Sequence, residues 1–107
     1  TFQFLTKNPK RYLDFVFPDN VWLGTTIDYV NQARLNYLKK TKGYKFVSFE
    51  PLLGDMSALD LTGIDLVIIG ADSNKGAKPP KKEWIDDLIN KAKQNNIEVF
   101  LKKNLYD

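Results

Sequence analysis

The sequence predicts an α/β fold built on a sheet of five parallel strands, and two observations carry this prediction. Five short runs rich in β-branched and aromatic residues alternate with segments of helical spacing, in the order β-α-β-α-β-loop-β-α-β. One run, Leu66 to Ile69, is apolar at every position, which is typical of a strand covered on both faces by helices. Alternation of this kind favours parallel strands joined by right-handed crossovers.

Each expected strand is a short apolar run bounded by turn-forming or polar residues. The five runs are Phe2–Thr6, Val21–Thr26, Lys45–Phe49, 65–70 and 98–102. Trp22 lies inside the second run, and we expect its indole to belong to the core rather than to stack on a ligand.

Three segments between the strands have helical spacing. The clearest one precedes the last strand, and its apolar stripe consists of Trp84, Ile85, Leu88, Ile89 and Ala92. A second helix is expected over residues 29–40, with Gly43 as a stop beyond it. A shorter first helix begins near Pro9 and is closed by Pro18. Residues 51–63 contain a proline and two glycines and predict an irregular connection.

Two architectures accommodate five parallel strands in this order. The sheet is either the C-terminal five-eighths of a TIM-like barrel or an open, flavodoxin-like doubly wound sheet, and periodicity alone does not choose between them. In both architectures, ligand sites lie at the carboxyl ends of the strands. In either architecture, functional residues are therefore expected at the carboxyl ends of the strands.

The composition bounds the function classes. A chain of 107 residues with 43% hydrophobic content predicts one α/β domain, 1–107. The absence of cysteine and histidine excludes disulfides, thiolate metal or cluster ligation by this chain, and serine–histidine triads. A net charge of +3 is too small to mark a nucleic-acid binder. No apolar run approaches the ~20 residues of a membrane span, so we expect a soluble, cytoplasmic protein without a membrane partner.

Polar residues follow each of the five expected strands. Glu50 is the most informative of them, because it directly follows Phe49 and precedes Pro51, where a carboxylate is partly desolvated. There it could accept hydrogen bonds from a ligand amine or hydroxyl, or act as a base. The alternative is that Glu50 forms an ion pair with Lys7 or Lys102 from a neighbouring strand end.

The segment after the fourth strand offers a second candidate site. Gly70 lies at the strand exit, where backbone can approach a ligand closely, and Asp72 and Ser73 follow it. Residues 75–82 then form a basic loop leading into a helix N-terminus, a place that favours anions. The phosphate-binding spacing G-x-x-x-x-G-K-[ST] is absent, so this is not a P-loop.

Several blocks of the sequence together resemble a known family. They are Phe4 to Pro9, Asn20 to Gly24, Ser48 to Gly54, Val67 to Gly70, and the closing Phe100 to Lys102. In this order they are similar to an uncharacterised phage and prokaryotic family that is itself distantly similar to radical S-adenosylmethionine enzymes. The Ser48 to Gly54 block is the most specific of them.

The resemblance implies a barrel-like fold, S-adenosylmethionine and a [4Fe–4S] cluster held by three cysteines near the N-terminus of the full-length parent. This chain has no cysteine and begins at Thr1, so we expect it to be the C-terminal part of a longer protein, with no cofactor or metal of its own. As the resemblance implies, it forms one wall of the site and is inactive alone. The implied catalytic residues are Glu50 and Asp72, and the implied cofactor-binding residues are Lys7, Ser48, Gly70, Ser73 and Lys102.

This sequence departs from the family pattern at two of these places. The family more often has Gly-Gly-Glu where Gly70, Ala71 and Asp72 stand, and arginine where Lys78 stands. Aspartate reaches one methylene less than glutamate, and lysine lacks the planar fork of arginine. We therefore expect ligand contacts at these positions to be altered.

Two other functions stay open at this point. The lysines of residues 75–82, with Lys7 and Arg11, could make a non-catalytic nucleic-acid-binding module, and the complete chain could be a flavodoxin-like ligand-binding domain. If the chain is part of a barrel, two open sheet edges and uncovered apolar surface would favour self-association.

Overall fold

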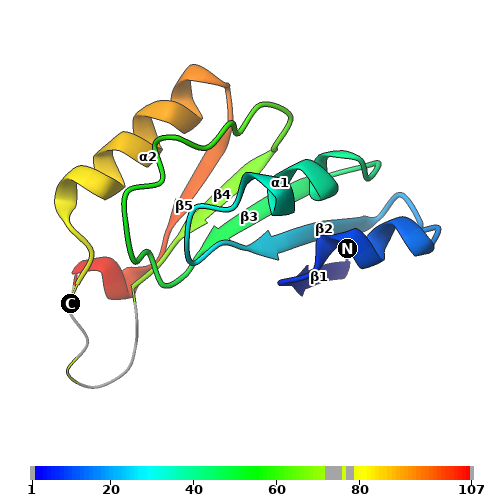
Figure 1. Cartoon of the computed structure of the whole chain (residues 1–107), viewed down its shortest axis with the longest axis horizontal. Helices are drawn as coiled ribbons and strands as arrows, with labels where there is room; N and C mark the ends of the chain where they lie inside the picture. Colours follow the sequence, from blue (N-terminus) through cyan, green and yellow to red (C-terminus); the bar gives the residue numbers. More distant parts are fainter. Residues whose placement is uncertain (1, 72–75, 77–78, 107) are drawn as a thin grey trace.

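The computed structural model describes residues 2–71, 76 and 79–106, and its centre is a five-stranded sheet (Figure 1). The strands are β1 (Phe2–Thr6), β2 (Val21–Thr26), β3 (Lys45–Phe49), β4 (Leu66–Ile69) and β5 (Glu98–Leu101). The helices are α1 (Gln32–Lys39) and α2 (Lys82–Gln94), with the 3-10 helices η1 (Pro9–Asp14) and η2 (Lys103–Tyr106). The α/β class predicted from the sequence is confirmed.

The sheet is parallel throughout, and its strand order follows the chain, β1-β2-β3-β4-β5. The first three strands have the predicted bounds, whereas β4 and β5 are shorter than the predicted runs 65–70 and 98–102. The order shows no reversal among these strands. All five carboxyl ends therefore lie along one edge of the sheet in sequence order.

The helices differ from the sequence predictions mainly at their ends. α1 begins at Gln32 rather than at Tyr29, because the Asn31 side chain accepts a hydrogen bond from the Arg34 amide and caps the helix there. The segment that begins at Pro9 forms the 3-10 helix η1 instead of an α-helix. Residues 51–63 contain no helix, as predicted.

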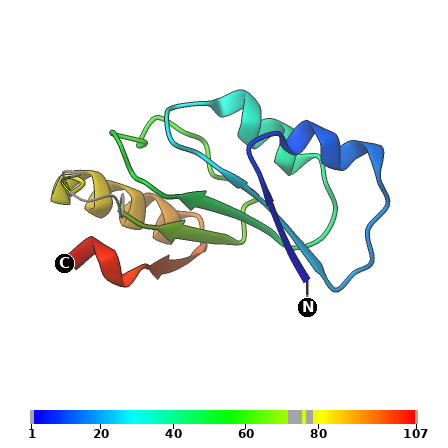
Figure 2. The same ribbon diagram turned by 90° about the horizontal axis from the view of Figure 1, so that it is seen from below.

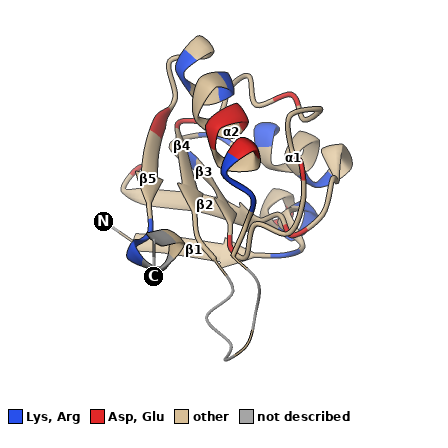
Figure 3. Ribbon diagram, turned by 90° about the vertical axis from the view of Figure 1, so that its left-hand side faces the viewer, with Lys and Arg blue, Asp and Glu red and all other residues tan. Residues whose placement is uncertain are grey.

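The core lies on one side of the sheet only. Its buried cluster joins strand residues such as Leu23, Val47 and Ile69 to α1 through Leu35 and to α2 through Leu88. Figure 2 shows η1, α1 and α2 on this same side of the sheet, and Figure 3 shows the same for α1 and α2. The prediction that β4 is covered on both faces is therefore wrong for the described chain: buried and half-buried residues alternate along this strand.

We call the other side of the sheet the open face. The register places on it Leu5, Trp22, Phe46, Ile68 and Phe100. Leu5 and Phe100 are each more than half exposed, and no helix of the described chain covers this side. Phe46 is the buried one of these five residues, because its ring lies over Gly24, where no side chain competes for the space.

The two tryptophans behave differently. Trp84 is half-buried and packs against the core cluster, whereas Trp22 lies on the open face, where it stacks on Tyr44 with ring centroids 4.3 Å apart. The core placement predicted for Trp22 is therefore wrong, since its face of the sheet has no covering layer here. Among the described residues, no helix combines the length and apolar character needed to cross a membrane.

Candidate functional site

The carboxyl ends of the strands carry a row of charged side chains around a glycine. We call this the tip row, and it consists of Lys7 after β1, Asp28 after β2, Glu50 after β3, Gly70 after β4 and Lys102 after β5. Alternation along each strand continues from open-face residues such as Ser48 and Phe100 into this row. The tip row therefore borders the open face at the edge where ligands bind in parallel α/β folds.

Glu50 and Lys102 form the central ion pair of the tip row. The Lys102 ammonium donates to Oε1 of Glu50 at 2.9 Å and lies 2.7 Å from Oε2. The side chains are 31% and 44% exposed, so the pair is neither buried nor free in solvent. Of the two partners considered for Glu50, Lys102 is thus the one that the structure brings to it.

The Glu50–Lys102 pair has to cross the end of β4, and Gly70 makes this crossing possible. A Cβ at residue 70 would lie 2.5 Å from Oε2 of Glu50, inside van der Waals contact. Gly70 also donates its backbone N–H to the Phe49 carbonyl at 3.0 Å. The group that approaches Gly70 closely is thus a carboxylate of the chain itself, and the approach of a ligand to this glycine stays a prediction.

Backbone hydrogen bonds hold these strand ends in place. The Leu52 amide donates to the Gly70 carbonyl at 2.9 Å, and the Lys102 amide donates to the Ile69 carbonyl at 2.9 Å. The peptide bond between Glu50 and Pro51 is cis. Three successive strand ends are thus tied to one another at the point where Glu50 emerges.

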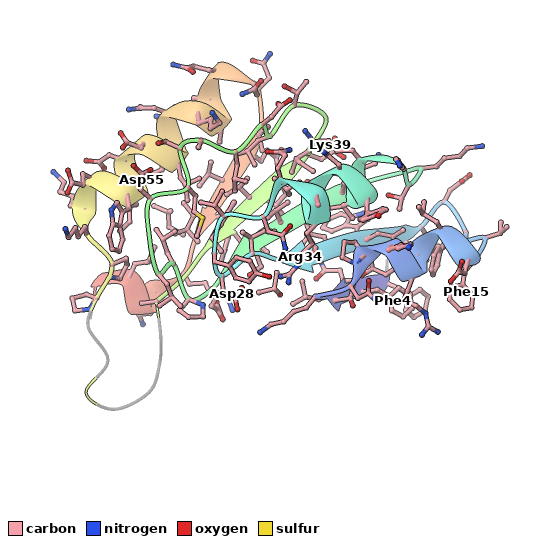
Figure 4. The ribbon with its side chains drawn as sticks, in the orientation of Figure 1. Phe4, Phe15, Asp28, Arg34, Lys39 and Asp55 are labelled. Carbon is pink, nitrogen blue, oxygen red and sulfur yellow. The ribbon has the colours of Figure 1, made fainter. Side chains whose placement is uncertain are left out.

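A second charged cluster lies at the first two strand ends. The Lys7 ammonium is 3.4 Å from Oδ2 of Asp28, and the Arg34 guanidinium is 3.9 Å from Oδ1. Arg34 also donates to the Thr26 carbonyl and lies over the Tyr29 ring, 5.6 Å from its centroid. Figure 4 shows Asp28 and Arg34 close together, between the strand end and α1.

Arg34 is the residue of this cluster that sequence reasoning missed. Its side chain is only 12% exposed, which is unusual for an arginine. The sole signal in the sequence was its place in the first turn of a helix that follows a strand end, and that signal is too common to single it out.

The two carboxylates of the tip row keep hydrogen-bonding capacity. Among the described residues, Oδ1 of Asp28 and Oε2 of Glu50 are buried atoms without a hydrogen-bond partner. Oε2 is within ion-pair distance of Lys102, but the hydrogen bond itself runs to Oε1. Chemically, this end of the sheet can accept hydrogen bonds from an amine or hydroxyl and can neutralise an anion through Lys7 or Lys102.

Ser48 lies under Glu50 on the same face of the sheet and is buried, with 7% of its surface exposed. Its carbonyl accepts the Ile27 amide at 2.9 Å, which fixes β3 against the residues that follow β2. The structure thus places Ser48 beside the tip row, and its role in cofactor binding stays a prediction.

Two predicted site residues, Asp72 and Ser73, lie outside the described residues, as do residues 75, 77 and 78 of the basic loop 75–82. Of that loop, Lys81 lies over the Trp84 ring, 5.4 Å from its centroid, and Lys82 begins α2. In the described part of the chain, no group of three or more acidic residues is arranged to hold a metal ion.

Comparison with known proteins gives one finding. Residues 1–104 match the model of a family described as "Protein of unknown function (DUF5131)", and the chain belongs to this family. No curated protein and no solved structure matches the chain. Membership of an uncharacterised family is thereby confirmed, while the likeness to radical S-adenosylmethionine enzymes stays a prediction.

Proposed function

We propose that this member of the DUF5131 family forms one wall of the cofactor and substrate site in a radical S-adenosylmethionine-like protein, and that it has no activity of its own. The observation that carries the proposal is the open face, which carries no described helix and ends in the tip row. Both features are those expected for the inner side of a barrel segment, whose sites lie at the carboxyl ends of its strands.

The arrangement of helices and strands supports the barrel alternative. In a barrel the helices form an outer ring around strands in sequential order, which agrees with η1, α1 and α2 on one side of the sheet. A doubly wound sheet carries helices on both faces and binds ligands where its strand order reverses. The sequential order β1 to β5 offers no such point.

The charges of the tip row fit the amino-acid end of S-adenosylmethionine. That end carries an ammonium and a carboxylate, which Glu50 and Lys102 complement. In contrast, the chain cannot hold a [4Fe–4S] cluster by thiolates, because it has no cysteine. The proposal therefore assigns to this chain only the recognition of a ligand.

Exchange of the Glu50–Lys102 pair for ligand contacts is energetically feasible. Partly exposed ion pairs contribute only about 0–1 kcal/mol to stability, so parting them costs little. Glu50 then accepts hydrogen bonds from the ligand ammonium, and Lys102 moves to the ligand carboxylate. Gly70 leaves room for the ligand as it leaves room for Glu50.

The test is an NMR titration of the isotope-labelled chain with S-adenosylmethionine, S-adenosylhomocysteine and adenosine. We expect the first two, which share the amino-acid end, to shift the amide signals of Gly70 and Lys102, and adenosine to shift them less. Glu50→Gln and Lys102→Met should each weaken binding at least tenfold. Glu98→Gln, on the same face at the opposite end of β5, and Lys103→Met serve as matched controls.

Two outcomes would count against this function. Absence of any shift at the strand ends with millimolar S-adenosylmethionine would remove the ligand site. Equal loss of binding in the Glu50 and Glu98 variants would show attraction by general charge rather than by the tip row.

A further inference from the structure

Two adjacent hollows lie on the helix-covered side of the sheet, next to its first strand. One, of about 250 Å³, lies between the residues after η1 and the end of α1. The other, of about 530 Å³, lies between β1 and η1. They share Tyr12, Phe15 and Phe17 as a common wall, and we call the two together the aromatic groove.

The aromatic groove exposes an unusual amount of large apolar surface. Phe4 is 47% and Phe15 57% exposed, and both line it, as does Val16, which is fully exposed. Figure 4 shows Phe4 and Phe15 near each other at this end of the molecule. Contiguous exposed apolar surface of this kind marks an interaction site rather than ordinary surface.

The wall between the hollows is held in place by specific contacts. The Phe17 ring meets the Phe4, Phe15 and Tyr12 rings at centroid distances of 5.9, 6.1 and 5.9 Å. The Tyr12 hydroxyl lies 2.8 Å from the Gly24 carbonyl oxygen and 3.0 Å from that of Phe4. The groove is therefore formed before a partner arrives, which lowers the entropy cost of binding.

The charged side chains that line the groove all have one sign. Lys40 and Lys42 line the first hollow and Arg11 lines the second, and none of the carboxylates in the described part of the chain lines either. Asp14 lies 4.0 Å from Arg11, but both side chains are 70% exposed, and such a pair screens the cation only weakly. The rim therefore favours an acidic partner.

We propose that the aromatic groove binds an amphipathic α-helix of another protein, with two apolar anchors on one face and carboxylates beside them. Such a helix presents apolar side chains from successive turns on one face, and the two hollows, which share a wall, offer a place for two of them. The basic rim then pairs with the flanking carboxylates. This function goes beyond the tip row and does not depend on it, because the groove lies on the opposite side of the sheet.

The described helices of a second copy do not offer such a ligand. The apolar residues of α1, Leu35 and Leu38, and those of α2, including Leu88, are buried in the chain's own core. A second copy would have to unfold a helix from its sheet to present an apolar stripe. The described helices of a second copy are therefore not the ligand that the groove fits.

Two designed peptides test this proposal by fluorescence anisotropy. Both are 18-residue amphipathic helices with the same leucine stripe, one flanked by glutamate and the other by lysine. We expect the glutamate peptide to bind the chain at least tenfold more tightly than the lysine peptide. Lys42→Glu should weaken the glutamate peptide and strengthen the lysine peptide, while Lys93→Glu, on the exposed side of α2, should change neither.

The aromatic contribution has its own matched control. Phe15→Ser should weaken the glutamate peptide at least tenfold, whereas Phe2→Ser should not, because Phe2 is 64% exposed on the same face of β1 but lines neither hollow. Circular dichroism checks that both variants are folded. Glu50→Gln should bind the peptide normally, and Phe15→Ser should bind S-adenosylmethionine as the parent chain does, which separates the two proposals.

Three results would overturn the proposal. The first is no binding of either peptide, and the second is equal binding of both with equal loss in the Phe15 and Phe2 variants. The third is a concentration-dependent dimer in sedimentation that Phe15→Ser abolishes, which would show that a second copy covers the groove.

Discussion

The ring of Phe46 lies over Gly24 on the neighbouring strand, in the space that any side chain at residue 24 would fill. We therefore expect Gly24→Ala to destabilise the chain by about 1–3 kcal/mol, the usual cost of overpacking a well-packed site. The measurement is the free energy of unfolding in urea. The double variant Gly24→Ala with Phe46→Leu should recover part of the loss, and a full-size loss in the double variant would contradict this explanation.

A side chain at Gly70 should disrupt the tip row more than the fold. In Gly70→Ala the new methyl group displaces the Glu50 carboxylate, so the Lys102 pair opens and the affinity for S-adenosylmethionine falls at least tenfold. Gly54→Ala is the matched control, because nothing lies within 4 Å of a Cβ there. Unchanged ligand affinity in Gly70→Ala would separate ligand binding from the position of Glu50.

The Tyr12 hydroxyl should matter for stability, because it lies within hydrogen-bond distance of carbonyl oxygens in β1 and β2 and so links η1 to both strands. Tyr12→Phe leaves two carbonyl oxygens with one partner fewer, and we expect a loss of about 1–3 kcal/mol in the free energy of unfolding. Tyr37→Phe, a substitution on α1, is the control. Equal stability of the two variants would mean that solvent replaces the Tyr12 hydroxyl without cost.

The same hydroxyl predicts that the free energy of unfolding depends on pH in the alkaline range. Burial raises the pKa of Tyr12 to about 12 from its ordinary value of 10.0. Because the folded pKa is the higher one, the stabilisation is fully present below pH 10.0 and is lost as the pH rises towards 12. Denaturation followed between these values should show a steeper loss in the parent chain than in Tyr12→Phe.

Two turns in the connection between β3 and β4 predict that the stability of the chain depends on pH in the acidic range. Hydrogen bonds from the Ser57 hydroxyl and amide lower the pKa of Asp55 below its ordinary value of 3.8, and those from Thr62, with the charge of Lys39, lower that of Asp60. The stabilisation that these interactions give the folded chain is complete above pH 3.8. It is lost as the pH falls through the lowered pKa values that the two carboxyls have in the folded state.

Acid titration of the unfolding midpoint tests these turns. The Asp55→Asn and Asp60→Asn double variant should show a smaller drop in the midpoint below pH 3.8 than the parent chain. The double variant Asp19→Asn with Asp87→Asn, at two exposed aspartates outside these turns, controls for the change in charge. An identical acid response of parent and double variant would refute the assignment.

Strand identity could be predicted from the sequence because each strand is a short apolar run with clear ends. The number of covered faces could not, because an apolar run such as Leu66 to Ile69 has the same letters whether helices or missing strands cover its second face. The same ambiguity led to the wrong prediction for Trp22, whose side of the sheet has no described layer above it. The apolar residues of a strand indicate that its surface will be buried, but they do not indicate which part of the protein buries it.

The candidate site was predictable to the extent that it depends on strand ends. Glu50, Gly70 and Lys102 meet because parallel strands bring their carboxyl ends to one edge, a consequence of topology that the alternation of elements already implies. Arg34 escaped prediction because its contact with Asp28 depends on the angle between α1 and the sheet. The aromatic groove escaped it too, because it depends on how η1 turns back over β1.

The pairing of Glu50 with Lys102 joins the third strand of the sheet to the fifth, across 52 positions of chain. During synthesis on the ribosome, the tip row cannot be complete until β5 has emerged and paired with β4. The ligand binding proposed for this edge would therefore require that the last strand has docked, and nascent or proteolytically shortened chains that end before Lys102 should show no binding in an assay.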